Sequence, residues 1–148
     1  MRRINSLTCS EHYKRKPRST FNVDLLRESS DDGPVTMINL IKYRTHSLDG
    51  DGTGREAYAR YTKPVQKLVE ERGGRVLWAG PVAEAALHEG GDVDWDWAIL
   101  VYYPSRAAFI DMVESKEFLA ANEHRRNGVE KHVIMAARTL LLEDLPEQ

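Results

Sequence analysis

The chain has 148 residues, 41% of them apolar and 30% charged, which is the composition of one water-soluble domain. Its formal net charge of −2 argues against a general nucleic-acid-binding protein, which needs a net basic face to meet phosphate. No apolar run reaches the roughly 18 residues of a membrane span, so we expect no membrane partner. Cys9 is the single cysteine, so no intramolecular disulfide can form, and we expect a reducing compartment, the cytoplasm.

Residues 1–33 are predicted to form a polar extension ahead of the domain. Basic side chains are concentrated in residues 1–18, where Glu11 is the one acidic residue. No apolar segment accompanies them, so the pattern is not that of a secretory signal. A loosely ordered extension fits this composition better than an organelle transit peptide does.

The end of this extension has a pattern of its own. Residues 20–28 fit a short helix capped by Thr20 or Asn22. The following run, Ser-Ser-Asp-Asp-Gly-Pro at 29–34, consists of turn-forming residues. We therefore expect the folded domain to occupy residues 34–148.

The first strand and helix of the domain are indicated by two different periodicities. Residues 35–43 are rich in β-branched and large apolar side chains on both faces, which is typical of a strand covered on both sides. Residues 55–72 repeat apolar side chains at intervals of three and four, which predicts a helix. Pro64 lies inside this helix and predicts a kink, and Gly73-Gly74 would end it.

The remaining elements follow from the same kinds of pattern. A strand over 75–87, bent near Gly80-Pro81, is followed by an acidic loop over 88–96 and a strand over 97–103. Two helices come next: one is capped by Ser105, and a short one over 116–126 begins at a Ser115 cap and stops at Asn127-Gly128. The last element is a strand over 132–142. The order β-α-β-β-α-β is the ferredoxin-like arrangement. We therefore predict an α+β sandwich, in which helices cover one face of a four-stranded antiparallel sheet.

The other face of this sheet also needs a cover. Strand 35–43 places Ile38 and Leu40 on one face and Met37 and Ile41 on the other, so both faces are apolar. A second copy of the chain is the simplest cover, through a two-fold contact that makes a dimeric α/β barrel. The alternative is that residues 20–30 of the same chain cover this face.

Several segments resemble a known family. Met-Ile-Asn-Leu-Ile-Lys-Tyr at 37–43 is similar to the first strand of the family called domain of unknown function 1330. The other similar segments are Tyr58 and Tyr61, residues 73–80, residues 97–109 and His124-Arg125. The resemblance spans residues 34–140 and implies the dimeric α/β-barrel superfamily. That superfamily includes cofactor-free monooxygenases, lactone isomerases, haem-handling enzymes and stress-responsive proteins, whose ligands lie between the sheet and its helices or loops. It supports the fold more than any chemistry.

Two polar residues of the first strand are candidate ligand-binding residues. Asparagine is disfavoured in strands, and burying the Asn39 amide without a partner would cost about 1–3 kcal/mol. Its partner is either a ligand or a structural bond to a loop or to the twin subunit. Lys42, near the strand end, either anchors an anionic substrate or is simply solvated.

Aromatic residues supply further ligand-binding candidates. The hydroxyls of Tyr58 and Tyr61 either orient a ligand or lie at the edge of core-packed rings. Trp78, Trp97 and Tyr102 stand in or near two strands that should be neighbours. They predict either an aromatic pocket or the core of a dimer.

The catalytic candidates are His124, Arg125 and Tyr61. His124 and Arg125 follow one another near a helix end, where they could act as an acid–base group and an anion clamp. The alternative is that this histidine simply favours the negative end of the helix dipole.

More specific motifs fail on inspection. Residues 49–54, Asp-Gly-Asp-Gly-Thr-Gly, begin like a calcium loop, but position twelve is Arg60 and not a glutamate. The five histidines have no metal-binding spacing, and no G-x-S-x-G motif is present. We predict no metal and no cofactor.

Two functions that involve a small molecule remain open at this point, beside a purely structural dimer domain with a filled interior. The first is a small-molecule-handling protein acting as a cofactor-independent oxygenase or isomerase on a polar aromatic or lactone-like compound. The second is a non-catalytic ligand-binding or stress-response dimer. Both predict the same partners, a small-molecule ligand and a second copy of the chain.

Overall fold

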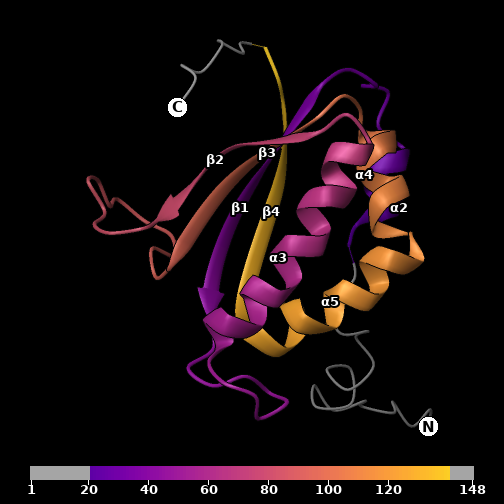
Figure 1. The fold of residues 1–148 in the computed structure, drawn as a ribbon. Helices are drawn as coiled ribbons and strands as arrows, with labels where there is room; N and C mark the ends of the chain where they lie inside the picture. The colour runs from indigo at the N-terminus through magenta and orange to yellow at the C-terminus, as the bar shows by residue number, and fades with distance from the viewer. Residues whose placement is uncertain (1–20, 141–148) are drawn as a thin grey trace, which may run out of the picture.

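A four-stranded antiparallel sheet in the order β2-β3-β1-β4 forms the centre of the protein, in a computed structural model that describes residues 21–140. Its strands are β1 Val35–Tyr43, β2 Arg75–Pro81, β3 Trp97–Tyr103 and β4 Val129–Arg138. The helices are α2 Val23–Arg27, α3 Gly54–Glu71, α4 Arg106–Val113 and α5 Lys116–Gly128. All of them lie on one side of the sheet (Figure 1). The predicted ferredoxin-like order is confirmed.

Strand β1 lies between β3 and β4 and alternates strictly. Its odd-numbered residues from Val35 to Ile41 are buried beneath the helices, and the even-numbered ones face the other way. The strand register then assigns each neighbouring residue to a face: Asn39, for example, lies between Ile99 of β3 and Ile134 of β4. We call the two sides the helix face and the open face.

The open face is apolar and uncovered within the described residues. Its larger side chains are Ile38, Leu40, Trp78, Leu100, Tyr102, Val133 and Met135. Trp78 is 51% exposed, Met135 46% and Val133 37%. A surface of this kind on a single chain is typical of an interaction face.

Hydroxyl side chains start the helices. Ser105 Oγ accepts a bond from the backbone N–H of Ala108 at 3.1 Å, and Ser115 Oγ accepts one from Phe118 at 3.2 Å. Both predicted caps are confirmed. Thr53 caps α3 in the same way, and α3 continues on both sides of Pro64.

The helix–strand boundaries differ from the prediction in several places, one of which is the end of β4 at Arg138 instead of residue 142. Strand β2 ends at Pro81 and not at residue 87: Val82 N–H still bonds the Asp96 carbonyl in register with the β2–β3 pairing, and beyond it the chain leaves the sheet as a loop. Helix α5 extends to Gly128, and β4 starts at the next residue, three residues before the predicted start. Helix α2 is shorter than the predicted 20–28, and Asn22 at its start makes no side-chain cap bond.

The segment before β1 packs on the helical side of the sheet. The Phe21 ring makes edge contacts with the rings of Phe109 and Phe118, at centroid distances of 6.0 and 5.4 Å. The alternative that residues 20–30 cover the open face is therefore wrong. Thr20, Cys9 and the basic residues 1–18 lie outside the described residues. No helix in the described part of the chain is long and apolar enough to cross a membrane.

Candidate functional site

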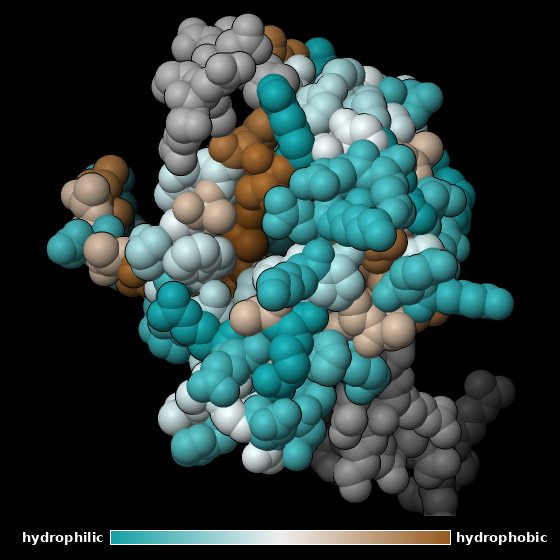
Figure 2. Space-filling view, viewed as in Figure 1, coloured by the Kyte–Doolittle hydropathy of each residue, from teal (hydrophilic) through white to brown (hydrophobic). Residues whose placement is uncertain are grey.

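A cavity of about 250 Å³ lies between the helix face of the sheet and α3; we call it the α3 cavity. Its aromatic wall consists of Phe21, Tyr58, Tyr61, Trp97, Tyr103, Phe109 and Phe118. Figure 2 shows a strip of apolar surface between the sheet and α3. Val76 and Ala79 of the edge strand β2 line the cavity and are exposed, so this edge forms its mouth.

Asn39 is the one polar side chain that β1 presents to this cavity, and it is 8% exposed. Its Oδ1 lies 3.0 Å from His132 Nε2, and its Nδ2 donates to the Met37 carbonyl at 3.2 Å. Asn39 is thus held by structural bonds to its own strand and to β4, which fixes the direction of its amide.

His132 and Arg125 continue this contact away from the cavity. Arg125 Nη1 lies 3.4 Å from His132 Nδ1, and arginine can only donate, so Nδ1 is the acceptor. The imidazole proton is then on Nε2 and donates to Asn39 Oδ1. Burial, and secondarily the charge of Arg125, lower the pKa of His132 to about 3. His132 is therefore neutral at physiological pH.

Arg125 itself is 5% exposed and held on several sides. Its Nε donates to Asn122 Oδ1 at 2.6 Å, and its guanidinium lies 5.3 Å from the centroid of the Phe21 ring. Burial lowers the pKa of Arg125, but a guanidinium remains charged. Its charge contributes to the lowered pKa of His132.

Two tyrosines from α3 bring hydroxyls to the cavity wall. The rings of Tyr58 and Tyr61 are 5.3 Å apart, and both are buried. Burial raises the pKa of Tyr61 to about 12 and raises that of Tyr58 well above its usual value. Both phenols therefore stay protonated and can donate a hydrogen bond to a ligand oxygen.

The residues selected from the sequence divide between the two sides of the sheet. Asn39, Tyr58, Tyr61 and Trp97 line the α3 cavity, and Arg125 connects to it through His132. Lys42, Trp78 and Tyr102 belong to the open face, so no single pocket in the described residues contains all of these side chains.

The side chain of His124 does not share the surroundings of Arg125, its neighbour in the sequence. It does not line the α3 cavity, and its Nδ1 is buried with no hydrogen-bond partner within the described chain. Successive residues of a helix point about 100° apart, so adjacent residues cannot share one target.

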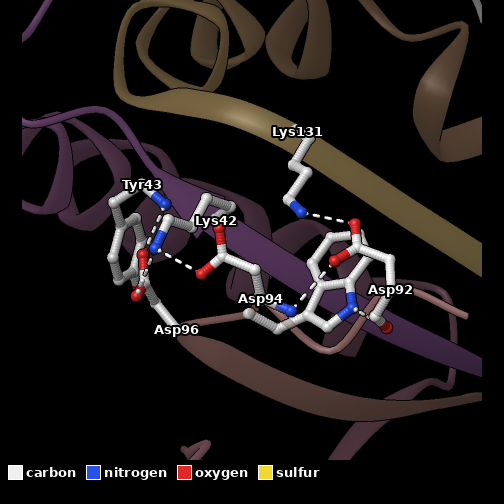
Figure 3. A network of polar contacts seen from close by, with 7 residues as sticks. Lys42, Tyr43, Asp92, Asp94, Asp96 and Lys131 are labelled. Carbon is white, nitrogen blue, oxygen red and sulfur yellow. Dashed lines mark hydrogen bonds and ion pairs between the residues drawn. The ribbon is translucent and has the colours of Figure 1, made fainter.

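Lys42 contacts carboxylates of the loop between β2 and β3 (Figure 3). Its Nζ lies 2.9 Å from Asp94 Oδ1 and 3.3 Å from Asp96 Oδ1. The bond to Asp94, more than the nearby charge of Asp96, raises the pKa of Lys42. Next to it, Lys131 pairs with Asp92. The charge of Lys42 is thus already compensated within the chain.

Sequence reasoning missed His132 and Phe21. The signal for His132 was available: in a strand, it shares a face with Ile134, two residues on. Phe21 carried no such signal, because it precedes the domain and a polar turn separates it from β1.

No group of three or more His, Cys, Asp or Glu side chains suited to a metal occurs within residues 21–140. In the loop that begins like a calcium site, Arg60 Nη2 donates to the Asp51 carbonyl at 3.1 Å and lies 4.0 Å from Asp49 Oδ2. A guanidinium therefore stands where the missing glutamate would be.

Solved structures similar to this chain share its fold. RPA0582, a protein of unknown function from Rhodopseudomonas palustris, is 31% identical with a TM-score of 0.72, over 80% of this chain and 92% of its own. A protein from Bacteroides thetaiotaomicron, provisionally assigned as an antibiotic biosynthesis monooxygenase, is 16% identical with a TM-score of 0.53, over 78% and 97%. The hydroxynitrile lyase of Passiflora edulis is 15% identical with a TM-score of 0.52, over 78% and 100%.

The sequence comparisons agree with the predicted resemblance. No curated protein matches the chain. The model of one family, domain of unknown function 1330, matches residues 49–138, which is more than half of the chain. The fold is the ferredoxin-like arrangement. The chain belongs to the DUF1330 family.

Proposed function

We propose that this protein binds a small planar aromatic molecule that carries an acceptor oxygen, in the α3 cavity. The observation that carries this proposal is the composition of one cavity wall: aromatic rings surround Asn39 and two phenols that stay protonated. Small-molecule sites are commonly apolar hollows with a few fixed polar groups of this kind.

The size of the cavity supports a ligand of one or two fused rings. An engineered apolar cavity of about 150 Å³ holds a single benzene molecule. The α3 cavity, at about 250 Å³, is larger, but it is small beside the sites of most drug-sized ligands.

The electrostatics of the polar end favour an oxygen with full or partial negative charge. Tyr58 and Tyr61 offer hydroxyl donors, and the Asn39 amide is fixed in place by its two bonds. Among the described residues that line the cavity there is no carboxylate to repel such an oxygen. A carboxylate, phenolate or aryl ketone meets these requirements.

A titration with 2-naphthoate, followed by calorimetry, tests the proposal. Replacing both phenols (Tyr58→Phe with Tyr61→Phe) should weaken binding by about tenfold, the effect of losing two modest hydrogen bonds. Tyr102→Phe is the matched control, because it removes a tyrosine hydroxyl from the open face and should leave the affinity unchanged.

A second variant tests the place of binding. Ala79→Trp puts an indole into the mouth of the cavity and should abolish naphthoate binding while leaving the fold intact, since Ala79 is exposed. Equal affinity of this variant and the unmodified protein would refute the α3 cavity as the site.

Catalysis is a second candidate function, as a cofactor-independent oxygenase or isomerase. Two fold neighbours are described as a monooxygenase and a lyase, and the two phenol donors could stabilise the oxyanion of an enolate. In this step a carbon acid loses its proton to water or buffer, and the electron pair moves to the oxygen that the phenols face. A non-catalytic ligand-binding or stress-response role is favoured instead by the absence of histidine and carboxylate from the described cavity wall.

Deuterium exchange distinguishes these two candidates. If the protein catalyses enolisation, the acidic C–H of 2-tetralone should exchange in D₂O faster with the protein than without it, as followed by NMR. Oxygen consumption under the same conditions would identify the oxygenase. A ketone that binds but is recovered without deuterium and without oxygen uptake supports the non-catalytic role.

We also propose that two copies pair through the open face. Apolar side chains lie along this face of both central strands, β1 and β3. No described segment of the same chain covers them. A second copy would bury Trp78, Val133 and Met135, in the two-fold contact that the sheet geometry allows.

A further inference from the structure

Phe21 lies between two cavities. One is the α3 cavity. The other, of about 480 Å³, lies between α2 and the β4 edge, and we call it the α2 cavity. Both are lined by Phe21, Met37, Phe109 and Ile134, so these four side chains form the boundary between them.

Phe21 is the one boundary residue that does not belong to the sheet or to α4. Met37 of β1 is 2% exposed and Phe109 of α4 is 4% exposed, and both belong to the central core. Phe21 precedes α2, a helix of five residues with no buried side chain. The boundary can therefore open at Phe21 without disrupting a strand or a long helix.

The contacts of Phe21 show what its ring replaces. Its edges meet the rings of Phe109 and Phe118, and its face meets the guanidinium of Arg125 at 5.3 Å. An aromatic ligand that extended from the α3 cavity would meet the same two rings and the same cation. The Phe21 ring thus occupies the position of a further ligand ring.

We propose that Phe21 determines the size of ligand that the site accepts. With the ring in place, the α3 cavity ends at Phe21 and holds one or two fused rings. Without it, the two cavities join, and the site admits a longer aromatic carboxylate. This inference rests on the proposed binding function and adds the residue that limits it.

The second cavity also defines the chemistry of the longer ligand. Arg125 and His132 line it, and its described wall contains no carboxylate. His132 is neutral, so Arg125 supplies the charge. An anionic group at the far end of an elongated aromatic ligand would therefore be favoured over a neutral one.

A ligand series of increasing length tests the inference by calorimetry. The probes are benzoate, 2-naphthoate, anthracene-2-carboxylate and the neutral anthracene-2-carboxamide. The unmodified protein should bind the anthracene acid at least about tenfold more weakly than naphthoate, the order of effect of exceeding a fitted apolar pocket. Phe21→Ala should remove this difference and should prefer the anthracene acid to its amide.

Two further variants make the test decisive. Leu25→Ala removes an exposed side chain that lines the α2 cavity alone, so it should keep the size limit of the unmodified protein. Phe21→Leu keeps an apolar anchor and should shift the limit in the same direction as Phe21→Ala, which covers the case in which the alanine variant does not fold.

The possible outcomes distinguish a failure of the inference about Phe21 from a failure of the proposed binding function. Binding of naphthoate with an unchanged size limit in both Phe21 variants overturns the role of Phe21 and leaves the binding function standing. Absence of binding of any probe, by the unmodified protein and by every variant, overturns the binding function and this inference with it.

Discussion

The two faces of the central strand β1 are both rich in apolar residues, but their surroundings differ. On the helix face, alternate residues from Val35 to Ile41 are buried, and Asn39 is bonded on both sides of its amide. On the open face, Ile38 and Leu40 have apolar neighbours on the adjacent strands and no cover from the described chain. One strand of nine residues thus has two different environments.

This difference separates the proposed ligand binding from the proposed association of two copies. A polar side chain is tolerated on the helix face because the fold provides its partners, and the space that remains there is a cavity. The open face has no such space, and its exposed apolar area is suited to contact with another surface. Substitutions on the two faces should therefore affect different measurements.

The largest expected effect is on association. Val133→Glu places a carboxylate on the open face at the edge strand β4 and should weaken pairing by about two orders of magnitude, because burying an unpaired charge costs several kcal/mol. Light scattering after size-exclusion chromatography would show the change in mass. Leu119→Glu, at an exposed leucine on α5, is the control and should not change the mass. A monomeric unmodified protein would contradict the proposed pairing.

Substitutions on the helical side of the sheet should change the stability of the protein. An alanine Cβ at Gly128 would clash with the Gly54 carbonyl oxygen and lie 2.9 Å from the Tyr58 N, so Gly128→Ala forces α3 and α5 apart. We expect a loss of about 1–3 kcal/mol in the free energy of unfolding, measured with urea. Gly90→Ala is the control, since its added Cβ would meet no other residue of the described chain within 4 Å. An equal loss in both variants would refute the close-packing argument.

A smaller effect concerns pH and His132. Its folded-state pKa of about 3 lies below the usual 6.5, so the unfolded chain binds this proton more readily. The contribution of His132 to the free energy of unfolding is fully present above pH 6.5 and decreases as the pH drops toward 3. Between pH 7 and pH 5 the loss should be about 2 kcal/mol. His132→Gln should lose less stability over this interval in urea titrations, and an identical pH dependence in the two proteins would exclude His132 as its source.

The smallest expected effect is at Lys42. Lys42→Met should leave the affinity for 2-naphthoate unchanged, because the lysine lies on the open face and is paired with Asp94 and Asp96. A marked loss of affinity in this variant would show that the two sides of the sheet do not act separately.

The local patterns of the sequence predicted most of the fold. Periodicity and cap residues such as Ser105 and Ser115 depend on near neighbours, which is why the order of strands and helices could be inferred without coordinates. The errors lie where distant contacts decide: the end of β2 depends on how far its pairing with β3 continues, and this pairing ends at the bond between Val82 and Asp96.

The candidate site was harder to predict from the sequence, because it too depends on contacts between residues far apart in the chain. Tyr58, Tyr61 and Asn39 were identified because a hydroxyl or amide on an apolar face needs a partner. Which face each aromatic residue of β2 and β3 occupies depends on strand register, and the irregularity between Val76 and Trp78 turns Trp78 to the open face.

The sequence by itself determined an α+β domain with two apolar sheet faces and an asparagine that needed bonding. Tertiary structure alone decided that the partner of Asn39 is His132, that Arg125 contacts His132, and that Phe21 lines the cavity. The physical reason is the sequence separation of the interacting residues. Helices, strands and caps depend on residues a few positions apart, whereas Asn39 and His132 are brought together by pairing between strands far apart in the chain.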